Sequence, residues 1–256
     1  MKRVEKFRVL TNNAIANNVF IMVVQAETKM EEIFPGQFVN ILVPNSQHAF
    51  LRRPISICDV DKNNNTLKFY IQQVGEGTKA LSKMKIGDTL DIMYPLGNGF
   101  QTDSKKPLLV GGGCGIAPLV YLSKCFYQKG IRPTVLLGGR NEQMLCLRSD
   151  FEPCADVYLI TDDGSLGEKG VVTQHSLFSD LSRFDKIYSC GPQIMMKAVA
   201  KLAINASLPC MVSLENTMAC GIGACLCCVT KTDEGHKCVC SDGPVFDVKT
   251  LQNFVE

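Results

Sequence analysis

The chain has no excess of charge of either sign. Its 256 residues include 27 Lys and Arg against 25 Asp and Glu, which gives a formal net charge of +2 with histidine neutral. A protein that binds nucleic acid or an anionic membrane through its surface charge carries a clear basic excess. We therefore expect neither nucleic acid nor a membrane as a partner.

Long hydrophobic runs are also missing. No apolar stretch approaches the roughly 18 residues that cross a bilayer, and the charged residues 2–8 lead into the polar residues 11–13 instead of an apolar secretory signal. The sequence also lacks internal repeats, low-complexity tracts and long linkers. It therefore predicts a soluble, cytoplasmic protein. Its length, with 46% hydrophobic residues, suffices for two domains and a small appendage.

Cysteine is abundant by contrast, with 13 residues. In a chain of this size without a secretory signal, cysteines fit reduced thiols and metal ligands better than disulfides. Cys220, Cys225 and Cys228 have the order C-x4-C-x2-C, and Cys240 follows at a distance. This is the plant-type spacing of a 2Fe-2S cluster. The two glycines inside the loop favour the same interpretation, because a freely turning backbone can aim its N–H groups at sulfur.

Two other interpretations of these cysteines stay open at this point. A structural zinc site would pair Cys225 and Cys228 with Cys238 and Cys240, although this is a poor version of two C-x2-C pairs. In the second interpretation, the cysteines bind no metal and are free, buried thiols. Cys227 and Cys238 lie inside the motif without being required by the spacing, so an exchange of ligands between neighbours also stays open.

Up to about residue 102, short strands alternate with turns. The candidate strands are rich in β-branched residues or alternate apolar and polar residues, and they cover residues 19–24, 38–43, 55–60, 67–74 and 90–93. Several short strands at this spacing are typical of a small antiparallel β-barrel. We assign this barrel to residues 1–102.

Two features of the barrel suit a flavin nucleotide. Arg53, Pro54, Ile55 and Ser56 begin a strand with a guanidinium and end with a hydroxyl, so this segment can pair with a pyrophosphate and hydrogen-bond an isoalloxazine edge. Downstream, a Gly-Glu-Gly-Thr turn leads into a short predicted helix over 79–84, whose first N–H groups can bind a phosphate. Taken alone, each feature has an ordinary alternative, an edge strand with solvated arginines and a simple turn.

A glycine cluster follows a buried strand in the middle of the chain. The strand covers residues 107–110, and the turn after it contains Gly111, Gly112, Gly113 and Gly115. An amphipathic helix then extends to about residue 129. Strand, glycine turn and helix form the arrangement in which backbone amides meet the pyrophosphate of a dinucleotide.

Strands and helices continue to alternate beyond this turn. The expected strands cover 134–137, 157–161 and 186–189, and the expected helices lie near 142–150 and over 192–203. This alternation predicts an open parallel sheet with crossover helices in an α/β domain over residues 103–209.

The identity of the dinucleotide depends on the residues that follow the strands. A free 2′-hydroxyl suits a carboxylate, whereas a 2′-phosphate requires a basic cluster. Asp162 and Asp163 follow one strand, and Arg140 has no basic cluster around it, so we favour NAD. Cys190 follows the strand 186–189, at a carboxyl end where such sheets bind ligands. Its ordinary alternative is a small buried hydrophobic residue.

The barrel motifs resemble the FAD domain of the ferredoxin-NADP reductase superfamily. Pro-Gly-Gln-Phe at 35–38, Arg-Pro-Ile-Ser at 53–56 and Gly-Glu-Gly-Thr at 75–78 occur in the order typical of that family. The resemblance implies that FAD is bound by Arg53, Pro54, Ile55, Ser56, Tyr70, Ile71, Gln72, Gly77 and Thr78. It also implies that Cys190 helps to position the nicotinamide. Ile55 stands where many members of the superfamily have tyrosine.

The order of barrel, nucleotide domain and C-terminal 2Fe-2S segment, assigned to 210–256, is similar to that in the electron-transfer subunits of type B, NAD-dependent dihydroorotate dehydrogenases. This resemblance covers nearly the whole chain and is most specific over 220–225 and 239–246. Cys114 in the glycine turn, Cys227 and Cys238 are departures from it. The expected fold is α+β and multidomain, with an antiparallel β-barrel for FAD, an α/β parallel sheet for NAD and a small cluster segment.

This resemblance also implies an electron path. Nicotinamide exchanges a hydride and a 2Fe-2S cluster carries one electron, so a flavin has to stand between them. By resemblance, the cluster then serves an FMN-containing catalytic subunit that oxidises dihydroorotate to orotate in pyrimidine biosynthesis. Two copies of each subunit would form a heterotetramer. We expect the loop 218–229 at the subunit interface.

Two other functions stay open on the sequence. One is the small subunit of an NADH-dependent ferredoxin:NADP oxidoreductase, or a related iron-sulfur flavoprotein reductase. The other is a regulator that senses NADH or oxygen through its cluster. The complete hydride path and the lack of a basic DNA-reading helix argue against a regulator.

Overall fold

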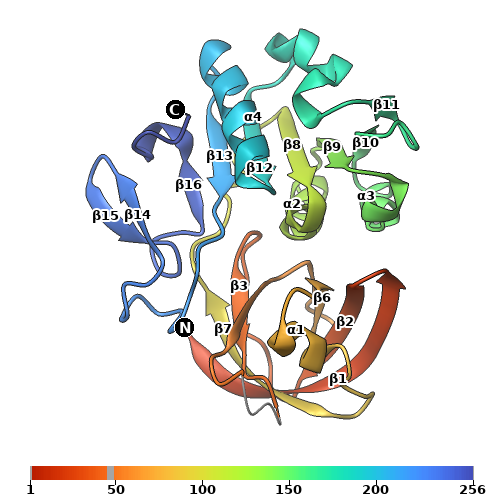
Figure 1. Ribbon diagram of the computed structural model, residues 1–256, viewed down its shortest axis with the longest axis vertical. Helices are drawn as coiled ribbons and strands as arrows, with labels where there is room; N and C mark the ends of the chain where they lie inside the picture. The colour runs from red at the N-terminus through yellow and green to blue at the C-terminus, as the bar shows by residue number, and fades with distance from the viewer. Residues whose placement is uncertain (1, 45–48, 256) are drawn as a thin grey trace.

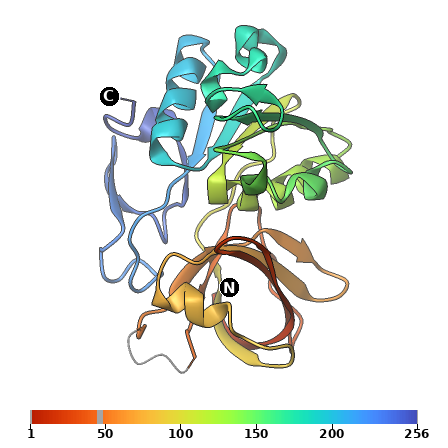
Figure 2. The same ribbon diagram turned by 45° about the vertical axis from the view of Figure 1, so that its right-hand side comes forward.

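The chain forms two seven-stranded sheets and a two-stranded hairpin in the computed structural model, which describes residues 2–44 and 49–255. The first sheet curls into the lower half of the molecule, and the second stands above it with its helices (Figures 1 and 2). The predicted α+β architecture is confirmed.

The first sheet is an antiparallel half-barrel. Its elements are β1 (Arg3–Ala16), β2 (Val19–Ala26), β3 (Phe38–Ile41), β4 (Arg53–Ser56), β5 (Asp59–Asp61), β6 (Thr66–Gln72), β7 (Thr89–Leu96) and the short helix α1 (Glu76–Leu81). The strand order is β4-β3-β7-β1-β2-β6-β5, so β4 and β5 are the edges. Alternate side chains of β6, Leu67, Phe69 and Ile71, fill the barrel core.

Two details of the barrel differ from the sequence prediction. The expected strand over 55–60 is two strands, because the chain changes partners within it. The Ile57 N–H donates to the Gln37 carbonyl oxygen at 3.1 Å, and the Cys58 N–H donates to the Lys68 carbonyl oxygen at 2.9 Å. The long strand β1 was not predicted, because charged and amide residues with weak strand propensity interrupt its apolar residues.

The second sheet is parallel except at one edge. It contains β8 (Pro107–Gly112), β9 (Thr134–Gly139), β10 (Asp156–Thr161), β11 (Glu168–Lys169), β12 (Lys186–Cys190), β13 (Cys210–Ser213) and β16 (Val245–Asp247), in the order β11-β10-β9-β8-β12-β13-β16. Only β16 is antiparallel to its neighbour. Every residue of β8 is buried, as expected for a strand covered on both faces. The predicted open parallel sheet is confirmed.

The helices of this half are α2 (Ala117–Gln128), α3 (Arg148–Phe151) and α4 (Gln193–Asn205). Short 3-10 helices are η1 (Gly113–Ile116), η2 (Glu142–Met144), η3 (Val172–Gln174), η4 (Ser176–Ser179), η5 (Leu181–Arg183) and η6 (Val248–Thr250). The predicted helix near 142–150 is interrupted, because Leu145 and Leu147 leave the helix and turn into the core. Crossover helices pack on both faces of the sheet (Figure 1).

The C-terminal segment has no separate core. After a long loop it forms the hairpin β14 (Val229–Thr232) and β15 (Gly235–Cys238), and then β16 joins the second sheet. Cys228, Cys240 and Phe246 pack in the same cluster as Leu108 and Val110 of β8. The domain boundaries at 102/103 and 209/210 stay predictions, and β13 begins at the second of them as a strand of the parallel sheet.

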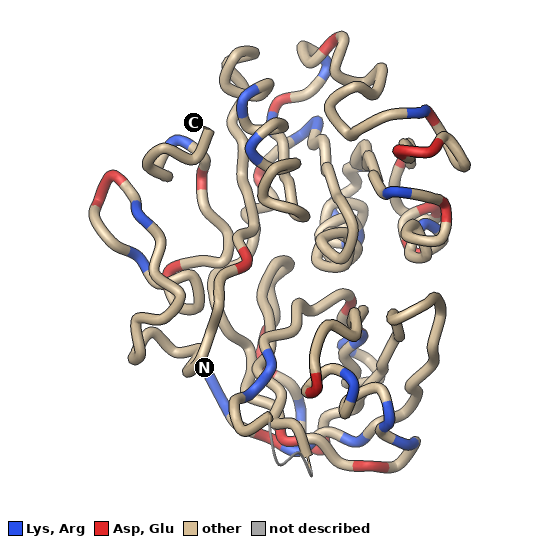
Figure 3. Tube along the Cα trace, in the orientation of Figure 1, with Lys and Arg blue, Asp and Glu red and all other residues tan. Residues whose placement is uncertain are grey.

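The half-barrel and the parallel sheet pack directly against each other. Tyr70 and Phe100 share a buried cluster with Leu109 and α2. Two ion pairs flank this contact, Lys124 with Asp59 and Lys68 with Asp150. Charges of both signs are scattered along the chain (Figure 3). Within residues 2–44 and 49–255, no helix is long and apolar enough to cross a membrane.

Candidate functional site

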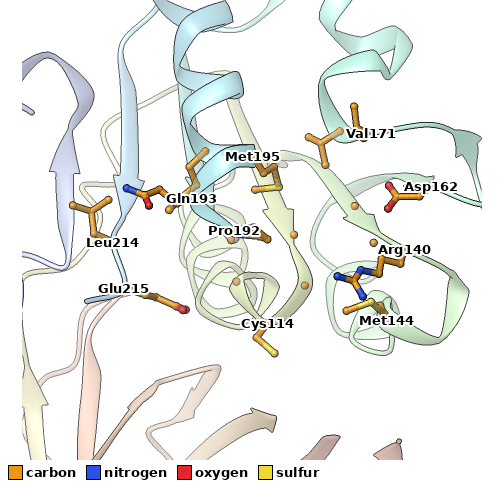
Figure 4. A pocket seen from close by; sticks show the side chains of 18 of the residues that line it. Cys114, Arg140, Met144, Asp162, Val171, Pro192, Gln193, Met195, Leu214 and Glu215 are labelled. Carbon is orange, nitrogen blue, oxygen red and sulfur yellow. The ribbon is translucent and has the colours of Figure 1, made fainter. Parts of the chain in front are cut away.

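A pocket of about 660 Å³ opens at the carboxyl ends of the parallel strands, above the half-barrel (Figure 4). Parallel sheets bind nucleotides at this edge. Its lining residues come from the glycine turn, the ends of four strands and the C-terminal segment, and they include Gly112, Gly113, Cys114, Gly115, Gly139, Arg140, Asp162, Gly191, Gln193, Glu215, Thr230 and Phe254. Residues of the predicted nucleotide domain and of the C-terminal segment therefore line the same pocket.

Three of the four predicted glycines, Gly112, Gly113 and Gly115, line this pocket. Gly115 has a clear steric requirement, because a Cβ there would lie 2.3 Å from the backbone nitrogen of Gly191. Gly111 does not line the pocket. It pairs with Cys190 between β8 and β12, below the pocket floor.

Cys190 is 1% exposed and also lies outside the pocket lining. Burial raises the pKa of its thiol far above the usual range. The residue after it, Gly191, lines the pocket. Cys190 can therefore act on a bound dinucleotide only by holding the turn that follows β12. Its positioning role stays a prediction.

Arg140 and Asp162 lie together at one end of the pocket (Figure 4). Arg140 directly follows β9, and Asp162 directly follows β10. Asp163 is not part of the lining. The carboxylate of Asp162 thus lies where the sequence predicts the group that prefers a free 2′-hydroxyl.

Glu215 and Cys114 mark the opposite end, which faces the half-barrel (Figure 4). Glu215 is exposed to solvent in the pocket. Protein atoms nevertheless surround much of its carboxyl group, and this burial raises the pKa of the carboxyl above the usual range. The Cys114 thiol donates to Oε1 of Gln72 on β6 at 3.2 Å. Glu215 lies in a segment, 213–215, that shares the resemblance to the family, but it was not among the predicted site residues because its place in the pocket is set by the return of the chain from β13.

The predicted FAD residues lie on both sides of an open seam in the half-barrel. Arg53, Pro54, Ile55 and Ser56 form β4 at one edge of the sheet, and the residues from Tyr70 to Gln72 end β6, beyond the last residue paired with β5. The two strands approach each other across the seam. A flat cofactor that enters this seam would meet side chains from both strands.

The first turn of α1 supplies the third part of this set, because the helix begins at Glu76 and ends at Leu81 and does not cover the predicted 79–84. A Cβ at Gly77 would lie 2.4 Å from Nε of Arg53, so the absence of a side chain lets the guanidinium pass over the turn. The Thr78 hydroxyl accepts the N–H groups of Val74 and Gly75 at 3.0 and 3.2 Å. The turn is thereby fixed beside a cation, an arrangement that fits a pyrophosphate.

Not every residue of this set can act through its side chain. Ile71 is 2% exposed and points into the barrel core, so it offers only its backbone. Tyr70 packs toward the parallel sheet, and burial raises the pKa of its hydroxyl above the usual range. Gln72 is exposed and reaches Cys114. The FAD contacts of the individual residues stay predictions.

The cysteine loop directs backbone N–H groups at sulfur. Cys220 Sγ accepts the N–H groups of Ile222 and Cys225, both at 3.4 Å, and Cys240 Sγ accepts the N–H of Gly223 at 3.1 Å. Burial acts to raise the pKa of the Cys220 thiol, but the N–H groups of the loop, together with the Cys225 thiol, outweigh it and lower the pKa to about 6. The loop therefore favours a thiolate before any metal binds.

The four predicted ligands are arranged as two pairs. The Cys225 N–H donates to Cys220 Sγ and the Cys240 N–H donates to Cys228 Sγ, both at 3.4 Å. Two irons with two thiolates each require such an arrangement, so the residues fit a 2Fe-2S cluster. Among the residues that the structure describes, no three His, Cys, Asp or Glu side chains converge on one point as a single zinc ion requires.

Cys227 is exposed, whereas Cys238 is buried on β15 beside Cys228. Cys238 Sγ lies 3.9 Å from the carbonyl oxygen of Gly223. Exposure does not set Cys227 apart, because Cys225 is exposed as well, and Cys238 is a neighbour of the second pair. The assignment of Cys220, Cys225, Cys228 and Cys240 as the ligands stays a prediction at the level of single residues.

Comparison with known families divides the chain into three matched regions. Residues 6–100 match the oxidoreductase FAD-binding domain, and residues 109–201 match the oxidoreductase NAD-binding domain. Residues 215–252 match the iron-sulfur cluster binding domain of dihydroorotate dehydrogenase B. The chain is thus an NAD-linked flavoprotein oxidoreductase with a cluster-binding segment, and the expected cofactors FAD, NAD and 2Fe-2S are confirmed.

Curated relatives match almost from end to end. A dihydroorotate dehydrogenase B (NAD(+)) electron transfer subunit from Lysinibacillus sphaericus is 39% identical, over 98% of this chain and 99% of the relative. The subunit from Caldanaerobacter subterraneus subsp. tengcongensis is 42% identical over 94% and 95%.

A solved structure of an NADH-dependent reduced ferredoxin-NADP oxidoreductase superposes with a TM-score of 0.85 at 32% identity. The match covers 96% of this chain and 89% of that one. A ferredoxin reductase of carbazole 1,9a-dioxygenase, at 20% identity and a TM-score of 0.70, shares the fold. Given the match of all three regions and the near-complete similarity to curated subunits, the chain belongs to the family of dihydroorotate dehydrogenase B (NAD(+)) electron transfer subunits.

Proposed function

We propose that this chain carries electrons between NAD(H) and a separate catalytic subunit that interconverts dihydroorotate and orotate. The observation that supports this most directly is the continuity of the three sites. Gln72 on β6 contacts Cys114 at the mouth of the nucleotide pocket, and Asn40 on β3 contacts Cys220 in the cysteine loop. These two contacts support a flavin site between the pocket and the cysteine loop.

The order of the sites matches what the cofactors can exchange. When bound, NAD supplies a two-electron hydride couple, FAD supplies a carrier of one or two electrons, and the cluster supplies a one-electron carrier. The protein binds and orients them. The glycine turn and the Gly191 turn would support the dinucleotide, β4 and the last residues of β6 would receive the flavin, and the loop N–H groups would stabilise thiolates.

The partner would be an FMN-containing catalytic subunit, in a heterotetramer with two copies of each chain in the cytoplasm. Leu226 in the cysteine loop is 65% exposed and Ile222 is 47% exposed, so an apolar surface adjoins the cluster ligands. Met218, in contrast, packs against the buried core. Leu226→Glu should therefore weaken association with the partner more than a change at Met218, and unchanged binding would count against this placement.

The first experiment is the absorption spectrum of anaerobically purified protein, with flavin, iron, acid-labile sulfide and zinc quantified before and after NADH is added. Flavin with equal amounts of iron and sulfide, all bleached by NADH, supports the electron path. Zinc without sulfide, or protein without flavin, refutes it. Co-purification of an FMN protein that oxidises dihydroorotate then identifies the partner.

A second candidate function follows from the TM-score of 0.85 with the NADH-dependent reduced ferredoxin-NADP oxidoreductase. In that case the partner would be a ferredoxin- and NADP-linked flavoprotein. The cofactor analysis would give the same result for both functions. Dihydroorotate added to the isolated complex separates them, because it reduces the cluster only when the pyrimidine enzyme is the partner.

A further inference from the structure

Asn40 connects the flavin strands to the cysteine loop. It lies on β3 in register with Pro54 of β4, the strand of the predicted FAD residues. Its side chain is buried, with 1% exposure, and Nδ2 donates to the carbonyl oxygen of Cys220 at 3.4 Å. A single carboxamide thus joins two segments that lie 180 residues apart in the sequence.

The cysteine loop is shaped to allow this contact. Gly221 has φ of +73°, and a Cβ at this position would lie 2.2 Å from Nδ2 of Asn40. A residue other than glycine would therefore be strained and would also collide with the carboxamide. Gly221 alone separates the Cys220 carbonyl from Ile222, and the N–H of Ile222 donates to Cys220 Sγ. The bond from Asn40 thereby fixes the start of the turn that directs N–H groups at the first cysteine.

Packing alone does not account for asparagine at this position. Oδ1 of Asn40 is buried and has no hydrogen-bond partner among the residues that the structure describes. An unpaired buried acceptor destabilises a fold, so an apolar side chain would suit this site better if it served only the core. The backbone of Asn40 is held as well, because Arg52 Nη1 donates to its carbonyl oxygen at 3.2 Å and Arg52 pairs with Asp91 at 2.6 Å.

We propose that Asn40 is a positioning residue for electron transfer between the flavin and the cluster. By holding the carbonyl of Cys220, it keeps the loop N–H groups directed at sulfur and keeps the loop against β3. Hydrogen bonds toward the sulfurs stabilise the reduced, more negative form of a cluster and raise its reduction potential. The proposal rests on the proposed function. The step concerned transfers one electron, and no bond forms or breaks at Asn40.

The test uses two variants of the full-length protein with both cofactors bound. Asn40→Leu removes the donor at similar size, and Asn40→Asp keeps the shape but places a carboxylate against the Cys220 carbonyl. We expect a lower cluster potential and altered EPR g values of the reduced cluster in both, with the larger change in Asn40→Asp. The ratio of reduced to oxidised cluster at a fixed solution potential should fall in Asn40→Leu by up to about tenfold, the limit that the full loss of one hydrogen bond to the reduced cluster would set.

The rate of flavin reduction and the thermal stability should not change in parallel with the reduction potential of the cluster. The rate at which NADH reduces the flavin should stay at the wild-type value, and the thermal stability of Asn40→Leu should change little, because the removal of an unpaired buried acceptor offsets the loss of the hydrogen bond to Cys220. Asn12→Leu is the matched control. Asn12 on β1 also has an unpaired buried Oδ1 within the part of the chain that the structure describes, and its Nδ2 donates to the Met84 carbonyl oxygen at 2.8 Å, elsewhere in the barrel. It should leave the cluster potential unchanged.

The possible results separate this inference from the proposed function. A wild-type cluster that NADH does not reduce refutes the proposed function. A wild-type cluster that is reduced, together with unchanged potential and g values in variants with full iron and flavin content, refutes the role of Asn40 alone. If Asn40→Leu fails to retain its cluster, the potential of Asn40→Asp decides.

Discussion

Gly115→Ala is the most direct test of the nucleotide pocket. The new Cβ would lie 2.3 Å from the nitrogen and 2.4 Å from the Cα of Gly191, and 2.5 Å from the carbonyl carbon of Cys190. All three atoms belong to the backbone, so no flexible side chain can move aside. Ordinary contacts begin near 3.4 Å. The glycine turn and the Gly191 turn would therefore have to separate by about 1 Å.

This separation lies within the pocket, because Gly115 and Gly191 both line it. A displacement of about 1 Å in a site that orients a hydride donor costs about 100-fold in rate, or about 2.7 kcal/mol in activation free energy. We expect the second-order rate constant for flavin reduction by NADH to fall by this factor. Anaerobic stopped-flow absorption measures it. Iron and flavin content should stay at the wild-type values.

Gly130→Asn is the matched control for Gly115→Ala. Gly130 follows α2 and has φ of +77°, a conformation that asparagine tolerates. A Cβ added there would meet no atom of the described residues within 4 Å. The variant should reduce its flavin at the wild-type rate. A Gly115→Ala protein with an unchanged rate would show that the two turns do not support the nicotinamide end of the dinucleotide.

Three further predictions concern other parts of the chain. Cys240→Ser should lower iron and acid-labile sulfide per chain, whereas Cys227→Ser should leave both unchanged; the reverse result would reassign the ligands. His175 is buried, which lowers its pKa. The unfolded chain therefore takes up a proton near pH 6.5 that the folded chain takes up only at lower pH, and the unfolding free energy should fall below about pH 6.5, by up to about 1.4 kcal/mol per pH unit. His175→Gln should flatten this dependence in urea denaturation, and an unchanged slope would exclude His175 as its source. Lys68→Met removes the ion pair with Asp150 between the two large domains and should cost about 0.5–1 kcal/mol, less at high salt; a salt-independent loss would point to packing instead.

The order of the sites could be predicted from the sequence because each depends on a local pattern. The β-branched run of β2, the Gly112 to Gly115 turn and the Cys220 to Cys228 spacing are each contained within about ten residues, and each has a direct physical meaning. Strand β1 lacked such a pattern, because charged and amide residues interrupt the alternation of its apolar residues. The break between β4 and β5 depends on a change of partner strand at Ile57, which no local sequence signal reveals.

Whether a single residue lines the site depends on which face of its strand it lies on and on where the strand ends. The sequence alone does not determine either with single-residue precision. Gly111 and Gly112 are adjacent, but only Gly112 lines the pocket, because Gly111 still lies within the β8 and β12 pairing. Ile71 shares a strand with Tyr70 and Gln72 but faces the opposite side. Glu215 and Phe254 reach the pocket from the C-terminal segment. Their positions depend on contacts between distant parts of the chain.

The cysteine segment is held by both large domains, and this bears on how electrons leave the flavin. It adds β16 to the parallel sheet and packs Cys240 in the core of that sheet. The barrel holds it from the other side, where the Asn98 side chain donates to the Asp242 carbonyl oxygen at 2.9 Å and Asn40 donates to that of Cys220. A segment fixed at both ends keeps a constant separation between flavin and cluster. We therefore expect transfer between the predicted flavin and cluster sites to require no domain movement, and the exposed Leu226 side of the loop remains available for the proposed partner interface.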